Sequence, residues 1–164
     1  MKNTMINDLI VHQFSRSLEA LNLIIDKAVV HSKERNFDEN TFMNVKFAPD
    51  MFTFCKQVQI ATDTAKGAVA RLSGKTAPVF KDDETTIAQL QERIKNTIHF
   101  VNEFSNCDFA GYESKIVTFP WYAGKAMNGH DYLVTHAIPN FYFHVTTAYD
   151  LLRANGVNNK KMDF

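Results

Sequence analysis

Apolar residues recur three or four positions apart along four long stretches of this 164-residue chain. The first stretch runs from about Thr4 to His31, and the second opens at Pro49 or Asp50 and ends at Gly74. The third follows Thr85 or Thr86, and the fourth covers about 130 to 155. Since each stretch carries an apolar stripe that must be buried, the sequence predicts an all-α four-helix bundle.

The segments between these helices carry weaker signals. Residues 31–44 are polar and predict a loop with a short helical turn at 38–43. The connection Lys75–Glu84 is long enough to cross the bundle instead of turning tightly. The β-branched run Ser114–Phe119 predicts a short β-hairpin between the third and fourth helices.

Two features shape the C-terminal part of the chain. Pro139 lies inside the fourth helical pattern, where a missing backbone N–H should kink or split the helix. The polar residues 158–164 predict a mobile or extended tail after a single bundle domain of residues 1–157.

The charge balance excludes several kinds of partner. Lys plus Arg and Asp plus Glu both number 18, which argues against a basic nucleic-acid surface and a polybasic membrane surface. No apolar run is long enough for a transmembrane helix, and the N-terminal segment lacks the apolar core of a signal peptide. We therefore expect a cytoplasmic protein with two reduced cysteines, Cys55 in a core stripe and Cys107 in a loop.

A polar pair stands out in the fourth helix. Asn140 and His144 lie one helical turn apart, with three aromatic residues between them. In such apolar surroundings the pair is either a buried hydrogen-bonding pair or part of a ligand or metal site.

Other polar side chains lie on or beside the apolar stripes: His12, Gln57, Gln59, Asp63 and His136. His136 and His144 are eight residues apart, about two turns, which is too far for both to bind one metal ion unaided. For any single histidine, a hydrogen-bonded core residue is therefore favoured over a metal ligand.

The sequence gives little support for nucleophilic catalysis or for a phosphate-binding loop. No histidine is near Cys55 in sequence, and the glycines lie at helix ends and loops instead of in a phosphate-binding loop. The acidic run Asp82–Glu84 is interpreted as solvated charge before a helix N-terminus.

Three segments resemble the DUF1993 family of unknown function: Gln57–Leu72, Thr85–Arg93 and Pro139–Val157. That family is similar to the wider DinB/YfiT-like superfamily of four-helix bundles. The resemblance implies an up-down-down-up bundle and a homodimer. Many superfamily members bind a divalent metal through one histidine on the second helix and an HxxxH pair on the fourth.

Carried over to this sequence, the resemblance implies a degenerate metal site. His144 matches the second histidine of the pair, Asn140 takes the place of the first, and Gln57 or Gln59 takes the helix-two position. Amide oxygens are weak ligands for zinc or nickel. We therefore expect no metal cofactor, and a polar network of Gln57, Gln59, Asn140 and His144 that either fixes the bundle or binds a small molecule.

Two other hypotheses stay open at this point. The chain could be a metal-dependent thiol transferase or hydrolase of DinB type, with zinc or nickel held by His144 together with His12, His136 or Asp63. It could also be an interaction module that presents Trp121 and Tyr122 to a partner.

Overall fold

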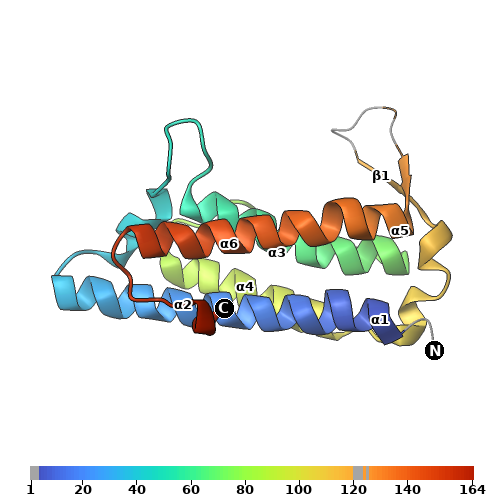
Figure 1. Ribbon diagram of the computed structural model, residues 1–164, viewed down its shortest axis with the longest axis horizontal. Coiled ribbons are helices and arrows are strands. Elements are labelled where there is room, and N and C mark those ends of the chain that lie inside the picture. Colours follow the sequence, from blue (N-terminus) through green and yellow to red (C-terminus); the bar gives the residue numbers. More distant parts are fainter. Residues whose placement is uncertain (1–3, 120–123, 125) are drawn as a thin grey trace.

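Four long helices dominate the computed structural model, which describes residues 4–119, 124 and 126–164 (Figure 1). The long helices are α2 (Gln13–Arg35), α3 (Phe54–Ser73), α4 (Ile87–Asn102) and α6 (Ile138–Ala154). The shorter helical elements are α1 (Thr4–Asn7), α5 (Gly129–Tyr132), two π-turns (Asp8–His12 and Leu133–Ala137) and 3₁₀ turns at Glu39–Asn44, Asn106–Phe109, Tyr112–Ser114 and Lys161–Asp163.

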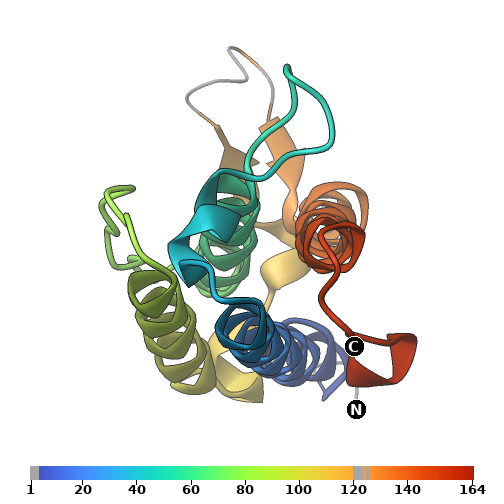
Figure 2. The ribbon, with the colours of Figure 1, turned by 90° about the vertical axis from the view of Figure 1, so that its left-hand side faces the viewer.

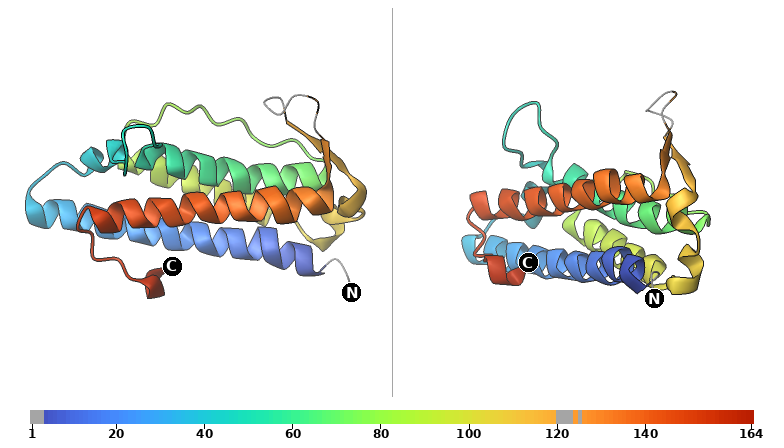
Figure 3. Two further views of the ribbon diagram at one scale, coloured as in Figure 1. Left: turned by 45° about the horizontal axis from the view of Figure 1, so that its top comes forward. Right: turned by 45° about the vertical axis from the view of Figure 1, so that its right-hand side comes forward.

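The helices follow the predicted up-down-down-up order. In Figures 1 and 3, α2 and α6 run in one direction, and α3 and α4 run in the other. Because α3 and α4 are consecutive and parallel, residues 74–86 must return along the length of the bundle, as the left view of Figure 3 shows. The prediction of a crossing connection is confirmed.

Each long helix packs against two others around a common core (Figure 2). Helix α3 contacts α4 and α6, and α2 contacts the same two helices. The stacked rings of Phe14 and Phe141, with centroids 4.0 Å apart, join α2 to α6. Three of the buried core side chains on α3 are small, Ala61, Ala65 and Ala68, which lets the neighbouring helices approach closely there.

The N-terminus of α3 differs from the prediction. The helix begins at Phe54, not at Pro49 or Asp50, because the Thr53 side chain accepts a hydrogen bond from the backbone N–H of Lys56 and caps the helix there. The start of α4 is as predicted: Thr86 is the N-cap, and it forms a capping box with Gln89.

The last helix is interrupted where Pro139 predicts it. Helices α5 and α6 are joined by the π-turn Leu133–Ala137, and Pro139 lies in the first turn of α6. A π-turn inserts one extra residue into a helix, so it accommodates a local break in the regular hydrogen-bond pattern. The same turn carries His136 on the side of α3.

The predicted hairpin is present as β1 (Ile116–Thr118) paired antiparallel with β2 (Ala126–Asn128). Trp121 and Tyr122 lie outside the described residues. The tail does not extend away as predicted. Asn159 is buried and bonds the backbone of Tyr149, and Asp163 forms a 2.7 Å ion pair with Lys27 of α2.

A buried arginine holds the returning connection against the bundle. The Arg93 side chain on α4 is 2% exposed, and it forms ion pairs with Asp63, Asp82 and Glu84 at 2.8, 3.1 and 2.9 Å. It also donates to the Lys81 carbonyl. The interpretation of Asp82–Glu84 as solvated charge is therefore wrong for Glu84, whose side chain is 10% exposed against Arg93, whereas Asp82 pairs with Arg93 and stays exposed.

We predict that Arg93→Met destabilises the fold by about 2–3 kcal/mol, because the largely buried Glu84 loses its cation, while the more exposed Asp63 and Asp82 add less. Urea unfolding measures the change. Arg16→Met is the matched control, since Arg16 is exposed on α2 and should change stability by less than about 0.5 kcal/mol. A loss in Arg93→Met as small as that of the control would show that the cluster contributes no more than a surface ion pair.

Candidate functional site

His144 pairs with Gln57 across the α3–α6 interface. His144 Nδ1 lies 2.6 Å from Gln57 Oε1, and both residues are buried. The Gln57 amide nitrogen donates to the Phe52 carbonyl at 3.4 Å, which turns the amide oxygen toward the imidazole. The oxygen can only accept, so Nδ1 carries the proton and Nε2 of His144 is left as an acceptor.

Burial keeps His144 neutral. Desolvation lowers the pKa of His144 from 6.5 to about 4. An imidazole in this state accepts a hydrogen bond at Nε2 and donates one at Nδ1 near neutral pH. The pair therefore behaves as an uncharged link between the two helices.

Asn140 lies one turn from His144 and makes a separate contact with α3. Its side-chain amide donates to Thr64 Oγ1 at 2.9 Å. Asn140 and Thr64 also line a hollow of about 240 Å³ beside the π-turn. The remaining lining residues of this α3–α6 hollow are Ile60, Asp63, Arg71, Phe119, Tyr132 and His136.

Aromatic and cationic groups form one end of the hollow. The Arg71 guanidinium donates to the Tyr132 hydroxyl at 3.2 Å and lies over the rings of Phe119 and Tyr132. His136 stacks on Tyr132, with ring centroids 5.7 Å apart. Burial, and then the charge of Arg71, lower the pKa of His136, so this ring is also neutral near pH 7.

Gln59 and Gln57 point to different neighbours. The amide nitrogen of Gln59 donates to Glu84 Oε2 at 2.8 Å, so Gln59 belongs to the Arg93 cluster. Asp63 lies between the two environments, because it lines the hollow and also pairs with Arg93. The structure therefore brings Gln57 to His144 and Asn140 to the hollow, but it places Gln59 elsewhere.

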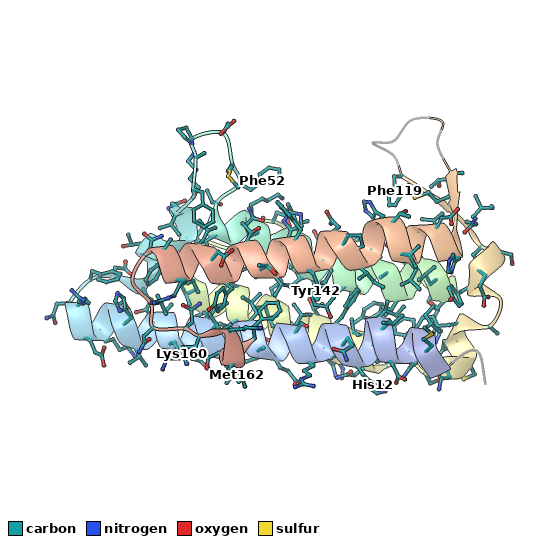
Figure 4. All side chains as sticks on the ribbon, viewed as in Figure 1. His12, Phe52, Phe119, Tyr142, Lys160 and Met162 are labelled. Carbon is teal, nitrogen blue, oxygen red and sulfur yellow. The ribbon has the colours of Figure 1, made fainter. Side chains whose placement is uncertain are left out.

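The predicted inner position of His12 is wrong. Its side chain is 66% exposed and contacts Asn7 and Asp8, and Figure 4 shows it pointing away from the bundle. The buried face of this segment includes Ile10 and Phe14, each two positions from His12. Two positions correspond to about 200° around a helix, so His12 faces solvent.

The residues around His144 do not fit a divalent transition metal. Neither contact partner, Gln57 or Phe143, carries an imidazole, thiolate or carboxylate. Within residues 4–119, 124 and 126–164, no three His, Cys, Asp or Glu side chains converge as a metal-binding group. His136 lies in the hollow against Tyr132, not beside His144 as a second ligand.

Sequence reasoning missed five residues of the hollow: the apolar Ile60 and Phe119, and the polar Thr64, Arg71 and Tyr132. Thr64 lies seven residues after Gln57, two turns along the same face of α3, and this spacing could have identified it. The position of Arg71 depends on the fold, since Tyr132, with which it bonds, is 61 residues away in sequence.

Comparison with known families agrees with this architecture. The sequence profile of the family described as "Domain of unknown function (DUF1993)" matches residues 6–164. The chain belongs to the DUF1993 family. The match runs through the C-terminal tail, in keeping with the packing of that tail on the bundle.

A solved structure gives a second comparison. A DinB family member protein from Shewanella denitrificans is 44% identical to this chain and superposes with a TM-score of 0.94. The similarity covers 98% of this chain and 92% of that one. No curated protein matches the sequence.

We predict that His144→Ala lowers the free energy of unfolding by about 1–3 kcal/mol at pH 7.5, because buried Gln57 loses its partner. Denaturant unfolding measures the loss. His99→Ala serves as the matched control, since the His99 side chain is 84% exposed on α4. Equal stability of His144→Ala and wild type would show that the link contributes nothing to the fold.

The same pair of proteins tests the neutral state of His144. Its folded pKa of about 4 lies below its usual 6.5, so the unfolded chain binds the proton first as pH falls. This group's contribution is therefore complete above pH 6.5 and declines toward pH 4. The stability difference between wild type and His144→Ala should shrink over that range, and a constant difference would contradict the assignment.

Proposed function

We propose that this DUF1993 protein binds a small molecule in a metal-free polar site at the α3–α6 hollow. The observation that carries the proposal is the gathering of Asp63, Arg71, His136 and Asn140 around a cavity with aromatic walls. Binding sites of this kind combine apolar walls with a few oriented polar groups. The Gln57–His144 link lies one helical turn beyond Asn140 and fixes the spacing of α3 and α6.

The chemistry of the site supports binding without a metal. Amide groups occupy two of the positions where the superfamily resemblance implies histidines, and one of them, Asn140, donates to Thr64. The neutral ring of His136 lines the hollow and can exchange hydrogen bonds with a ligand, whereas the neutral ring of His144 bonds Gln57. The alternative, a metal-dependent transferase or hydrolase, lacks converging ligands within the described part of the chain.

The proposed setting is a cytoplasmic homodimer. No helix among the described residues is long and apolar enough to cross a bilayer. Two exposed side chains, Phe52 and Phe143, form an apolar patch that supports self-association. Phe143 contacts His144, and Gln57 joins His144 to the backbone of Phe52, so both flank the Gln57–His144 link. Phe47 and Met51, in the segment before α3, are also exposed.

We predict that a library of small polar metabolites, screened by ligand-observed NMR, contains binders that the Asn140→Ala variant loses. Asn140 lines the hollow, so its removal should weaken binding by about tenfold, the effect of one hydrogen bond. Asn96→Ala is the matched control, because Asn96 is exposed on α4. Binders retained equally by both variants would place the site elsewhere.

The protein for this screen is purified without added metal, and its metal content is measured by elemental analysis. We expect less than stoichiometric metal, and unchanged melting in a chelator. A stoichiometric metal that disappears in His144→Ala would overturn the metal-free part of the proposal.

For the homodimer, we predict that Phe52→Ser combined with Phe143→Ser shifts the sedimentation equilibrium toward monomer. These side chains are 55% and 57% exposed, and burying them against a second copy would remove apolar surface from water. Val79→Ser is the matched control, because Val79 is exposed on the connection between α3 and α4. A wild-type monomer, or a double variant that stays dimeric, would contradict the role of this patch.

A further inference from the structure

Arg71 is a cation without an acidic partner at the end of the α3–α6 hollow. Its one hydrogen bond to the described residues is to the Tyr132 hydroxyl, and within those residues it has no carboxylate at ion-pair distance. The guanidinium carbon lies 5.3 Å from the Phe119 ring centroid and 5.9 Å from that of Tyr132. Aromatic faces stabilise a cation but leave most of its N–H donors available.

The carboxylate of Asp63, on the same hollow, is committed to other cations. Its Oδ1 accepts from Lys66 Nζ at 2.9 Å and from Arg93 Nη2 at 2.8 Å. The surrounding cluster contains three cations and three carboxylates: Lys56, Lys66, Arg93, Asp63, Asp82 and Glu84. Because these charges balance, the charge of Arg71 is the unmatched one in the hollow.

The other polar groups of the hollow are uncharged near neutral pH. His136 is kept neutral by burial and by Arg71 itself. Asn140 uses one amide hydrogen on Thr64, which leaves its oxygen as an acceptor. Ile60 and Phe119 line the hollow with apolar groups and the buried Tyr132 closes its end, so the hollow offers one positive charge beside apolar side chains.

Gly67 lies inside α3, not at a helix end or in a loop as predicted, and it provides the space that the Arg71 side chain occupies. A Cβ atom at position 67 would overlap Nη1 of Arg71, which lies one turn further along α3. The absence of a side chain at Gly67 therefore lets the guanidinium fold back along the helix toward Tyr132. Alanine at this position would displace the end of a flexible side chain and leave the backbone in place.

We propose that the α3–α6 hollow binds a small organic anion, with its carboxylate at Arg71 and a small apolar body against Ile60 and Phe119. This inference rests on the proposed function and gives it a ligand class. An arginine fork matches a carboxylate with two parallel hydrogen bonds. The volume of about 240 Å³ lies below the range of about 300–1,000 Å³ that is typical of drug-sized ligands, so the anion is small.

Benzoate is a suitable probe because it joins a carboxylate to a flat ring. Its binding to the full chain is measured by two-dimensional NMR titration, beside benzamide, which has the same shape without the charge, and inorganic phosphate, which has charge without the ring. We expect saturable shifts near Tyr132 and Asn140 with benzoate, and affinity weaker by about tenfold or more for the other two probes. If benzamide bound as tightly as benzoate, the carboxylate charge would have no role in binding. If phosphate bound more tightly than benzoate, the apolar side chains of the hollow would have none.

Two variants test the position of the guanidinium. Arg71→Gln removes the charge, and Gly67→Ala keeps the charge but displaces it, while alanine favours the helix. Both substitutions should lower the affinity for benzoate by about tenfold or more. The melting temperature of Gly67→Ala should equal or exceed that of wild type. Arg16→Gln is the matched control on the exposed face of α2. Unchanged benzoate affinity in folded Gly67→Ala would overturn the proposal.

The metabolite screen separates this inference from the proposed function. Binders at the hollow that are neutral or cationic, together with no response to benzoate, would overturn the anion assignment and leave small-molecule binding standing. A screen without binders and a titration without shifts would overturn both.

Discussion

The buried cation of Arg93 is the interaction on which the topology depends. An up-down-down-up bundle places two consecutive helices in parallel, so the chain between them must return along the whole bundle. Such a segment buries little apolar surface of its own. Here it is fixed by Arg93 through Glu84, Asp82 and the Lys81 carbonyl, and Phe80 lies within cation–π distance of both Lys66 and Arg93. The ion pairs lie partly out of solvent, where removal of one partner is costly.

This cluster also divides the polar residues of α3 between two environments. Gln59 bonds Glu84 of the Arg93 cluster and the charge of Asp63 is balanced by Arg93, whereas Gln57 and Thr64 turn toward α6. The two glutamines are two positions apart, which places them on different sides of the helix. The positive charge of the α3–α6 hollow follows from this division, because cations of the cluster balance the negative charge of Asp63.

Much of the fold could be predicted from the sequence, because helical periodicity and caps are local. Thr86, Pro139 and the β-branched run Ser114–Phe119 each marked a feature that is present. Contacts between distant segments could not be predicted in the same way. The inward orientation of Arg93 depends on carboxylates that lie across the returning connection and on α3.

The candidate site was predictable only in part, for the same reason. Asn140 and His144 were identified from their spacing, but Gln57 and Gln59 could not be separated without the rotation of α3. His12 was misplaced because the consecutive apolar residues before it, Leu9 to Val11, fit more than one helical phase. The environment of Arg71 follows from tertiary contacts with Tyr132 and from the missing side chain of Gly67.

These contacts support the proposal that a ligand binds near the π-turn and that His144 has a structural role. At His144, the donor Nδ1–H is matched by Gln57 at 2.6 Å, and a low pKa keeps the ring uncharged. One turn away, the amide of Asn140 is oriented by Thr64 and its oxygen is left beside the hollow. Two turns away, the π-turn presents His136 next to an unmatched Arg71. Polar groups that already have hydrogen-bond partners hold the helices together. A ligand would gain the most binding free energy at the charge that has no acidic partner among the described residues, Arg71.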